Sequence, residues 1–193
     1  LINLQLRAIT EKELSQERLL RIIKIRLWIE ILKIILDVTY NPMNISKYKK
    51  VLSKYATGIT VVTKKDKNNF VTGITVNSFV SISLKPTYIS WSLDKTTSSF
   101  KKFNNLKFFN IYILSAKQIE VSNYFSSKNE VKKNSIIAKN LLKYNLGELN
   151  CKTIKKINIG DHLFFVAKVI KFKLKKEEKP LIYFASKYKK LSW

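Results

Sequence analysis

The feature that most constrains the fold is a series of β-branched and aromatic runs separated by turns and short helical patterns. Such residues favour extended strands because their side chains pack well on a pleated surface. The strand-like runs cover residues 59–63, 70–84, 88–93, 108–114, 163–174 and 181–185. A polar turn separates the first two runs, which are expected to pair as a hairpin. The strands do not alternate regularly with helices, so a mainly β barrel with helical insertions is expected rather than a doubly wound sheet.

Helical patterns occupy several of the remaining segments. In 45–55 the apolar residues recur at the spacing of one helical face, at Ile45, Tyr48, Val51, Leu52 and Tyr55. A short helix is expected within 96–105, and a weaker helical pattern covers 130–144. Ser115 and Gln118 have the spacing of a capping box, which predicts the start of another helix.

Composition changes at Met43, the only methionine of the chain. All four arginines precede it and none follows it. We therefore expect residues 43–193 to form the folded domain from a natural start at Met43, and residues 1–42 to be a helical N-terminal extension from upstream sequence. Within the extension, the pattern of residues 11–36 predicts a helix. Charged residues interrupt its apolar stretch, so it is poorly suited to span a bilayer. That helix could instead lie on a membrane surface or on a partner.

Three global counts limit the classes of function. Cys151 is the only cysteine, so no disulfide forms within one chain, which fits a reducing compartment such as the cytoplasm. His162 is the only histidine, and one Cys with one His cannot build a closed zinc site, so no metal is expected. The net charge of +24 indicates either a polyanion partner or lysine spread over solvated surface. The second interpretation is favoured because arginine, which binds phosphate and guanine best, is absent after Arg26.

Two polar clusters are candidate ligand sites. The run 73–83 places hydroxyls and one amide in an otherwise apolar strand, and burying such groups costs free energy unless each has a hydrogen-bond partner. The partner could be the protein itself or a bound polar ligand, and residue types leave both open. The segment 92–99 leads from a strand into a helix. Its N–H groups, hydroxyls and Lys95 could bind phosphate, or Asp94 or Thr96 could simply cap the helix.

Seven short motifs, in order and with natural spacing, make residues 43–191 similar to one family. They are Y-A-T-G-I-T-V-V-T at 55–63, G-I-T-V-N-S-F at 73–79 followed by S-I-S-L-K-P at 81–86, S-S-F at 98–100, N-I-Y-I-L at 110–114 with Gln118, Ser122 with Phe125, G-D-H at 160–162, and P-L-I-Y-F at 180–184. The chain resembles the flavin reductase-like family, small NAD(P)H:flavin oxidoreductases that serve two-component monooxygenases. It departs from the family at Lys85, often a proline, and at Ala167, often a glycine.

The resemblance implies an FMN-binding split β-barrel that works as a homodimer, with flavin near the subunit interface. NADH or NADPH would reduce FMN, or alternatively FAD, and a partner monooxygenase would use the reduced flavin. The residues implied for the isoalloxazine ring are Thr75, Val76, Asn77 and Ser78, with Ser81 and Ser83 as further contacts. Those implied for the ribityl phosphate region are Ser92, Leu93, Lys95, Ser98 and Ser99. His162, beside Asp161, would lie near the nicotinamide or the flavin ring.

Hydride transfer between these cofactors needs no protein nucleophile, which agrees with the lack of a convincing catalytic set. No G-x-G-x-x-G occurs, so a Rossmann nucleotide site is not expected and the nicotinamide would bind transiently in the flavin groove. Two alternatives stay open at this point. One is a non-catalytic or electron-carrying FMN-binding protein of the same fold, and the other is a basic nucleic-acid-binding module.

Overall fold

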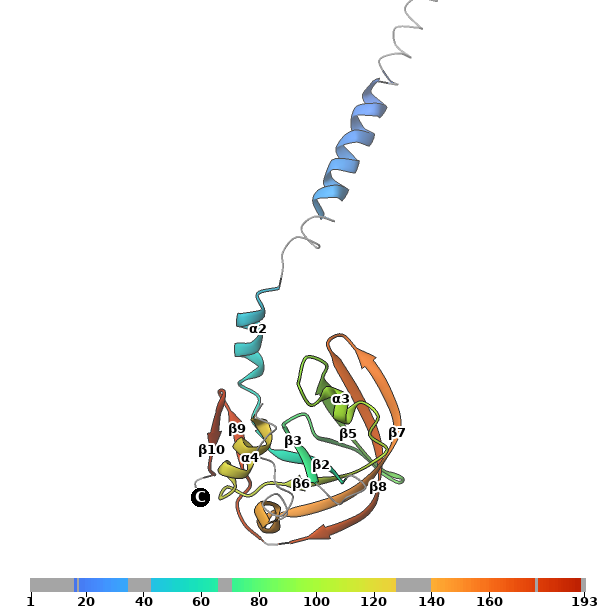
Figure 1. Cartoon of the computed structure of the whole chain (residues 1–193). Helices are drawn as coiled ribbons and strands as arrows, with labels where there is room; N and C mark the ends of the chain where they lie inside the picture. The colour runs from blue at the N-terminus through green and yellow to red at the C-terminus, as the bar shows by residue number, and fades with distance from the viewer. Residues whose placement is uncertain are drawn as a thin grey trace, which may run out of the picture. The chain divides into compact units, whose positions relative to one another are not determined.

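The computed structural model describes residues 16, 18–34, 43–65, 71–127, 140–175 and 177–191. The chain separates into two units, Leu1–Lys49 and Lys50–Trp193. In the first unit, residues 18–34 are helical and their side chains are exposed (Figure 1). The helix predicted at 11–36 is confirmed for residues 18–34. Of its remaining residues, only residue 16 is described. No helix in the described part of the chain is long and apolar enough to cross a membrane.

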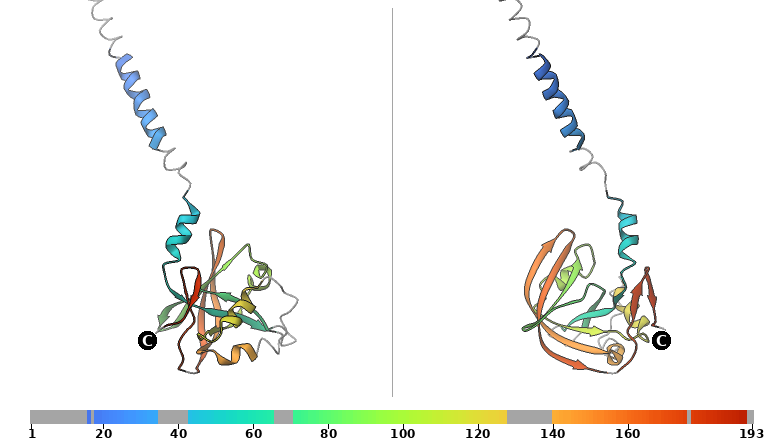
Figure 2. Two further views of the ribbon diagram at one scale, coloured as in Figure 1. Left: turned by 90° about the vertical axis from the view of Figure 1, so that its left-hand side faces the viewer. Right: turned by 180° about the vertical axis from the view of Figure 1, so that it is seen from behind.

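Seven antiparallel strands of the second unit form one curved sheet (Figures 1 and 2). In chain order the strands are β2 Thr60–Lys65, β3 Val71–Val76, β4 Val80–Leu84, β5 Thr87–Asp94, β6 Phe108–Ile113, β7 Gly147–Ile159 and β8 His162–Leu174. Their order across the sheet is β3-β2-β6-β7-β8-β5-β4. The two edge strands are therefore consecutive in the chain, joined by residues 77–79. This link spans roughly 14 Å at most, so the sheet must curl until its edges approach each other.

This arrangement confirms the expected mainly β, split-barrel type of fold. The edges β3 and β4 are not hydrogen-bonded to each other, so the barrel is not closed. The predicted hairpin is confirmed, because β2 and β3 pair along their whole length from Thr60↔Val76 to Lys65↔Val71. The run 70–84 is nevertheless two strands rather than one, and its two halves lie at opposite edges of the sheet.

Strand β7 is the largest element that the sequence did not predict. It pairs with both β6 and β8, and its register shifts between Thr153 and Lys155. Such a bulge inserts an extra residue and reverses the side-chain alternation of the strand. Cys151 and Ile159, which would share a face in a regular strand, accordingly differ: Cys151 is buried and Ile159 is exposed. Because apolar and polar residues switch faces partway along β7, the sequence of this strand does not show the regular alternation by which a strand is predicted.

Four short helices and a small second sheet complete the described fold. The helices are α2 Ile45–Leu52, α3 Phe100–Phe103, α4 Ile119–Ser126 and the 3-10 helix η2 Leu142–Tyr144. The second sheet has the order β1-β9-β10 and contains β1 Thr57–Gly58, β9 Ile182–Phe184 and β10 Lys187–Lys189. The helices predicted at 45–55, within 96–105 and after Ser115 are thus present but shorter. Most of the helix predicted at 130–144 lies outside the described residues, and its end contains η2. Strands β1 and β10 were not predicted.

The capping box before α4 forms only in part. The Gln118 side chain accepts the Ser115 backbone N–H at 3.0 Å, as a capping box requires. The helix, however, begins at Ile119, and the Ser115 hydroxyl is buried without a partner. A turn between Ser115 and Gln118, closed by a backbone hydrogen bond of 2.9 Å, therefore precedes the helix.

Two apolar clusters hold the sheet and α4 in place. One fills the concave side of the sheet, where Trp91 stacks on Phe165 with ring centroids 4.4 Å apart. The other packs α4 on the opposite face through residues such as Val61, Val121 and Phe125. Strand β3 approaches α4 so closely that a Cβ on Gly73 would lie 2.5 Å from the Phe125 ring. This contact fixes the strand whose end carries the 77–79 link.

Candidate flavin site on one face of the sheet

The 77–79 link is fixed to strand β5 by one serine. The Ser78 hydroxyl donates a hydrogen bond to the Ser92 carbonyl at 3.2 Å and accepts the Ser92 N–H at 3.0 Å. Asn77, one residue earlier, is exposed, and no described residue hydrogen-bonds its amide. The first polar cluster thus supplies partners internally for Ser78 and leaves Asn77 available to a ligand.

The end of β5 forms a capped turn. The Asp94 carboxylate accepts both the N–H and the hydroxyl of Thr96 at 2.7 Å, and the Asp94 carbonyl accepts the Thr97 hydroxyl at 2.9 Å. Asp94 thus closes a turn and does not cap helix α3, whose N-cap position is Ser99, so the predicted helix cap at Asp94 or Thr96 is wrong. Ser98 is exposed, and the half-buried Ser99 makes no side-chain cap bond, so capping of the helix engages neither hydroxyl. Helix α3 has four residues, so a phosphate here would depend on these hydroxyls and on nearby lysines.

Lys95 joins this turn to the β7–β8 hairpin. Its backbone N–H donates to the Asp161 carbonyl at 2.9 Å, and its ammonium donates to the Gly160 carbonyl at 2.8 Å. Gly160 has a φ of +52°, which glycine adopts without the strain that a Cβ would cause. The same hairpin sets Asp94 opposite His162 in the β5–β8 ladder. Lys95 therefore acts within the protein as a clamp that holds the G-D-H turn against the 94–99 segment.

Asp161 and His162 form a close pair at this turn. The Asp161 carboxylate lies 2.6 Å from His162 Nδ1, and the His162 side chain is 41% exposed. The hydrogen bond from His162, and then its charge, lower the pKa of the Asp161 carboxyl. Because Nδ1 is engaged, the imidazole ring is held in one orientation with Nε2 as its remaining polar atom.

The alternation of β5 determines which side chains can reach a ligand. Trp91 and Leu93 are buried in the core, so Ser92 and Asp94 point to the opposite face of the sheet. Leu93 and Val76 both lie in the core cluster, so they could offer a ligand only their backbone groups.

Thr75 and the two serines of β4 complete the set of implied residues. The Thr75 hydroxyl is occupied, since it donates to the Ser122 carbonyl at 2.8 Å. Ser81 is exposed and Ser83 half-buried on the edge strand β4, where the pairing with β5 is irregular. The structure thus brings the 75–78, 92–99 and 160–162 segments together, and Ser81 and Ser83 extend the same edge.

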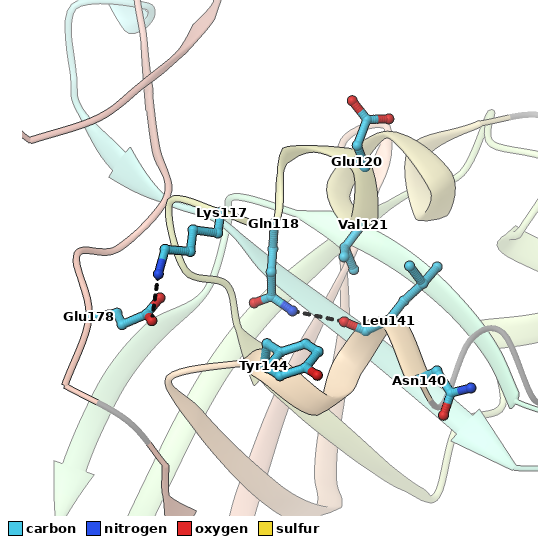
Figure 3. A pocket seen from close by; sticks show the side chains of 8 residues that line it. All are labelled: Lys117, Gln118, Glu120, Val121, Asn140, Leu141, Tyr144 and Glu178. Carbon is cyan, nitrogen blue, oxygen red and sulfur yellow. Dashed lines mark hydrogen bonds and ion pairs between the residues drawn. The ribbon is translucent and has the colours of Figure 1, made fainter.

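A separate cavity of about 700 Å³ lies beside α4 (Figure 3). Its walls are formed by Lys117, Gln118, Glu120, Val121, Asn140, Leu141, Tyr144 and Glu178. Gln118 donates to the Leu141 carbonyl at 2.9 Å, and Lys117 forms an ion pair with Glu178 at 3.0 Å. None of the implied cofactor residues lines this cavity, which could not be predicted because its walls come from separate segments.

The comparison with known proteins identifies the family. The family described as flavin reductase like domain matches residues 52–192, which is most of the chain. The chain therefore belongs to the flavin reductase-like family, and the resemblance seen in the seven motifs is confirmed.

Two curated relatives and one solved structure illustrate the likeness. The FMN reductase (NADH) SmoA of Agrobacterium fabrum is 29% identical over 136 residues, covering 66% of this chain and 76% of the relative. The reductase component of 4-hydroxyphenylacetate 3-monooxygenase of Thermus thermophilus is 27% identical over 146 residues, covering 76% and 96%. The structure of the flavin reductase PheA2 in its native state has a TM-score of 0.67 and 28% identity, covering 78% of this chain and all of that one.

Proposed function

We propose that this chain is an NAD(P)H:flavin oxidoreductase that transfers a hydride from NADH or NADPH to FMN. Membership of the flavin reductase-like family supports the activity. The observation that carries the site is the pair of Lys95 hydrogen bonds that join the G-D-H turn to the 94–99 segment. They join two motifs that are far apart in the sequence, and the two bonds between Ser78 and Ser92 link the 75–78 segment to the same strand.

The polar groups of this surface suit a flavin nucleotide. The exposed Asn77 amide carries both donors and an acceptor, which is what the polar edge of a flavin ring requires. The hydroxyls of Ser98 and Ser99, next to Lys101 and Lys102, suit a phosphate. We assign FMN on this basis, with FAD as the alternative.

Bound flavin would supply the hydride-accepting chemistry, and the chain's own residues would bind, orient and shield it. Ser78 keeps the Asn77 turn rigid through its two bonds to Ser92. The Asp161 carboxylate holds the His162 ring at the edge of the same surface, where it would position the nicotinamide. Thr75, Val76, Leu93 and Lys95 would contribute backbone groups or support, since their side chains are already engaged or buried.

A second copy of the chain would complete the site. Strand β4 follows the Asn77 turn directly, and its apolar side chains Val80, Ile82 and Leu84 are 51–80% exposed. An exposed row of apolar residues beside a ligand site indicates an interaction surface for another protein surface. Such a surface would also exclude water from the reacting rings. We therefore propose a homodimer with the flavin near its interface.

The reduced flavin would pass to a separate oxygenase, in keeping with the Thermus thermophilus relative, which is named the reductase component of a monooxygenase. We place the protein in the cytoplasm, in keeping with its single, buried and unpaired Cys151. We assign the domain to residues 43–193, which includes the whole family match. No metal is assigned, and the described residues contain no group of three His, Cys, Asp or Glu side chains that could hold one.

Anaerobic stopped-flow mixing of the FMN-loaded protein with NADH or NADPH tests the activity. We expect loss of the visible flavin absorption, and a weaker FMN affinity by roughly tenfold for Asn77→Ala or Ser98→Ala, since each loses about one polar contact to the ligand. Ser126→Ala is a matched control, because this exposed serine on α4 donates its hydroxyl to the Asn123 carbonyl of its own turn and lies outside the proposed site. Bound FMN that NADH and NADPH leave oxidised would favour the non-catalytic alternative. Failure to bind any flavin would refute the site itself.

A further inference from the structure

A smaller cavity, of about 240 Å³, lies where strand β2 ends and where β3 and β7 begin. Pockets for drug-sized ligands have volumes of about 300–1,000 Å³, so this cavity fits a smaller molecule than a nucleotide. Its described walls include no residue of the 75–78, 92–99 or 160–162 segments and none of the walls of the α4 cavity. It is therefore separate from both sites described above.

Asn145, in the wall of this cavity, has a buried oxygen that lacks a donor. The residue is 2% exposed, and its Nδ2 donates to the Leu142 carbonyl at 2.5 Å. That bond fixes the orientation of the amide, so Oδ1 points away from Leu142 and meets no donor among the described residues. The next residue is held in place, since the Leu146 N–H donates to the Ile113 carbonyl at 2.8 Å. A buried acceptor without a donor costs free energy, so this oxygen indicates a ligand that brings one.

The same wall contains a carboxylate beside a hydroxyl. Tyr112 and Glu148 are directly opposite each other in the β6–β7 ladder, so their side chains share one face of the sheet. Burial, and to a smaller extent the charge of Glu148, raise the pKa of the Tyr112 hydroxyl, which therefore keeps its proton at neutral pH. Among the described residues, no lysine or arginine forms an ion pair with Glu148. Its carboxylate is thus available to a cationic group in the cavity.

Three lysines from separate segments also line the cavity, Lys65, Lys143 and Lys175, and all three are exposed. In a chain with a net charge of +24, exposed lysines alone would not indicate a site. Here they limit the ligand, because three ammonium groups repel a simple cation. The Glu148 carboxylate and the Asn145 oxygen equally disfavour a simple anion. A molecule that carries both charges satisfies both sets of groups.

We propose that this cavity binds a small aliphatic α-amino acid in its zwitterionic form. The ammonium group donates to the Glu148 carboxylate and to Asn145 Oδ1, and the lysines donate to the carboxylate of the ligand. The apolar part of the wall comes from Val71 and Leu142, which are 5% and 4% exposed, and it contacts the aliphatic side chain. The volume of the cavity suits a side chain such as that of valine.

Titration calorimetry of the full chain with L-valine tests the proposal. We expect one site per chain with a dissociation constant below about 1 mM. Isovalerate lacks the ammonium group of valine and isobutylamine lacks its carboxylate. Each should bind roughly tenfold more weakly than L-valine, because each loses one set of charge-assisted hydrogen bonds. The proposal is overturned if L-valine does not bind at about 20 mM, or if either probe binds as tightly as L-valine. Inorganic phosphate that binds more tightly than L-valine would show a simple anion site and overturn it equally.

Charge variants test the two ends of the site. Glu148→Gln keeps the size of the side chain and should raise the L-valine dissociation constant roughly 10–100-fold, while Glu120→Gln, on exposed α4, is the matched control. The double variant Lys65→Gln with Lys175→Gln should bind L-valine more weakly and isobutylamine more tightly, because it no longer repels a cation. Lys187→Gln, on β10, controls for the loss of an exposed lysine. Unchanged L-valine affinity in Glu148→Gln would contradict the assigned role of the carboxylate.

NMR of the isotope-labelled full chain locates the ligand. Saturating L-valine should move the signals of Thr63, Tyr112 and Asn145, which all line the cavity. Shifts confined to Asn77 and Ser98 would place the amino acid at the proposed flavin site and overturn the proposal. None of these measurements requires flavin. A chain that binds L-valine here but binds no flavin would refute the proposed function and leave this inference intact.

Discussion

Gly73 is the position where one added methyl group should most clearly disturb the site from a distance. A Cβ there would lie 2.5 Å from Cδ1 and 2.6 Å from Cε1 of Phe125. Carbon atoms pack best at about 3.5–4.0 Å, so strand β3 and helix α4 would have to separate by roughly 1 Å. Phe125 is 1% exposed, so its ring is packed in the core and cannot turn toward solvent without opening it.

The size of the effect follows from two opposing terms. Overpacking of a buried site costs about 1–3 kcal/mol. Replacing glycine with alanine returns about 0.5–1 kcal/mol because the unfolded chain loses conformational freedom. The net loss for Gly73→Ala is therefore about 1–2 kcal/mol, which lowers Tm by roughly 2–8 °C for a chain of this size.

Thermal and urea unfolding measure this loss, and FMN titration measures its consequence for the site. Gly58→Ala is the control, since a Cβ there meets nothing within 4 Å. Adding Phe125→Leu to Gly73→Ala should recover part of the loss, with a favourable coupling of about 0.5–1.5 kcal/mol between the two changes. A Gly73→Ala protein as stable as the wild type, or strictly additive changes, would refute the reasoning that the glycine exists to admit the Phe125 ring.

Three further predictions concern the site and its surroundings. Ser78→Ala removes both hydrogen bonds to Ser92 and so frees the Asn77 turn. The FMN dissociation constant, measured by fluorescence, should rise about 5–20-fold. An unchanged dissociation constant would show that the turn needs no such bond. His162 lowers the pKa of the Asp161 carboxyl, so carbon NMR should show it titrating below its usual 3.8 in the wild type and at its usual value in His162→Gln. The stabilisation from the pair is complete above about pH 4 and is lost as the pH falls through the lowered pKa. A normal titration of Asp161 in the wild type would contradict the contact. Burial raises the pKa of Cys151 to about 12, so a thiol reagent should modify it only after unfolding, and rapid labelling of the native protein would contradict its buried position.

Much of the sheet could be predicted from the sequence because most of its strands keep one pattern throughout. The alternation of Ile170, Phe172 and Leu174 with lysines indicated β8, and β-branched runs indicated β2, β3 and β6. The proposed joint role of Asn77, Ser98 and His162 was implied by the family resemblance. No local pattern contains it, because it depends on the curl of the sheet and on the Lys95 clamp across 65 residues of chain.

Other features could not be predicted for identifiable reasons. The bulge in β7 reverses its alternation, so its apolar residues fit neither a strand nor a helix period. The core positions of Leu93 and Val76 depend on which face of the sheet becomes concave, which residue types do not specify. The cavity beside α4 joins side chains from three segments and has no signature in any of them.

The most direct test of the account is a titration of the isotope-labelled protein with FMN, followed by the NMR shifts of individual residues. The account predicts that saturating FMN moves the signals of three segments together, 75–78, 92–99 and 160–162, with Asn77, Ser98 and His162 among the largest changes. Shifts concentrated instead at Val121, Leu141 and Tyr144, with the Asn77 and Ser98 signals unmoved, would place the flavin in the α4 cavity and contradict the central claim.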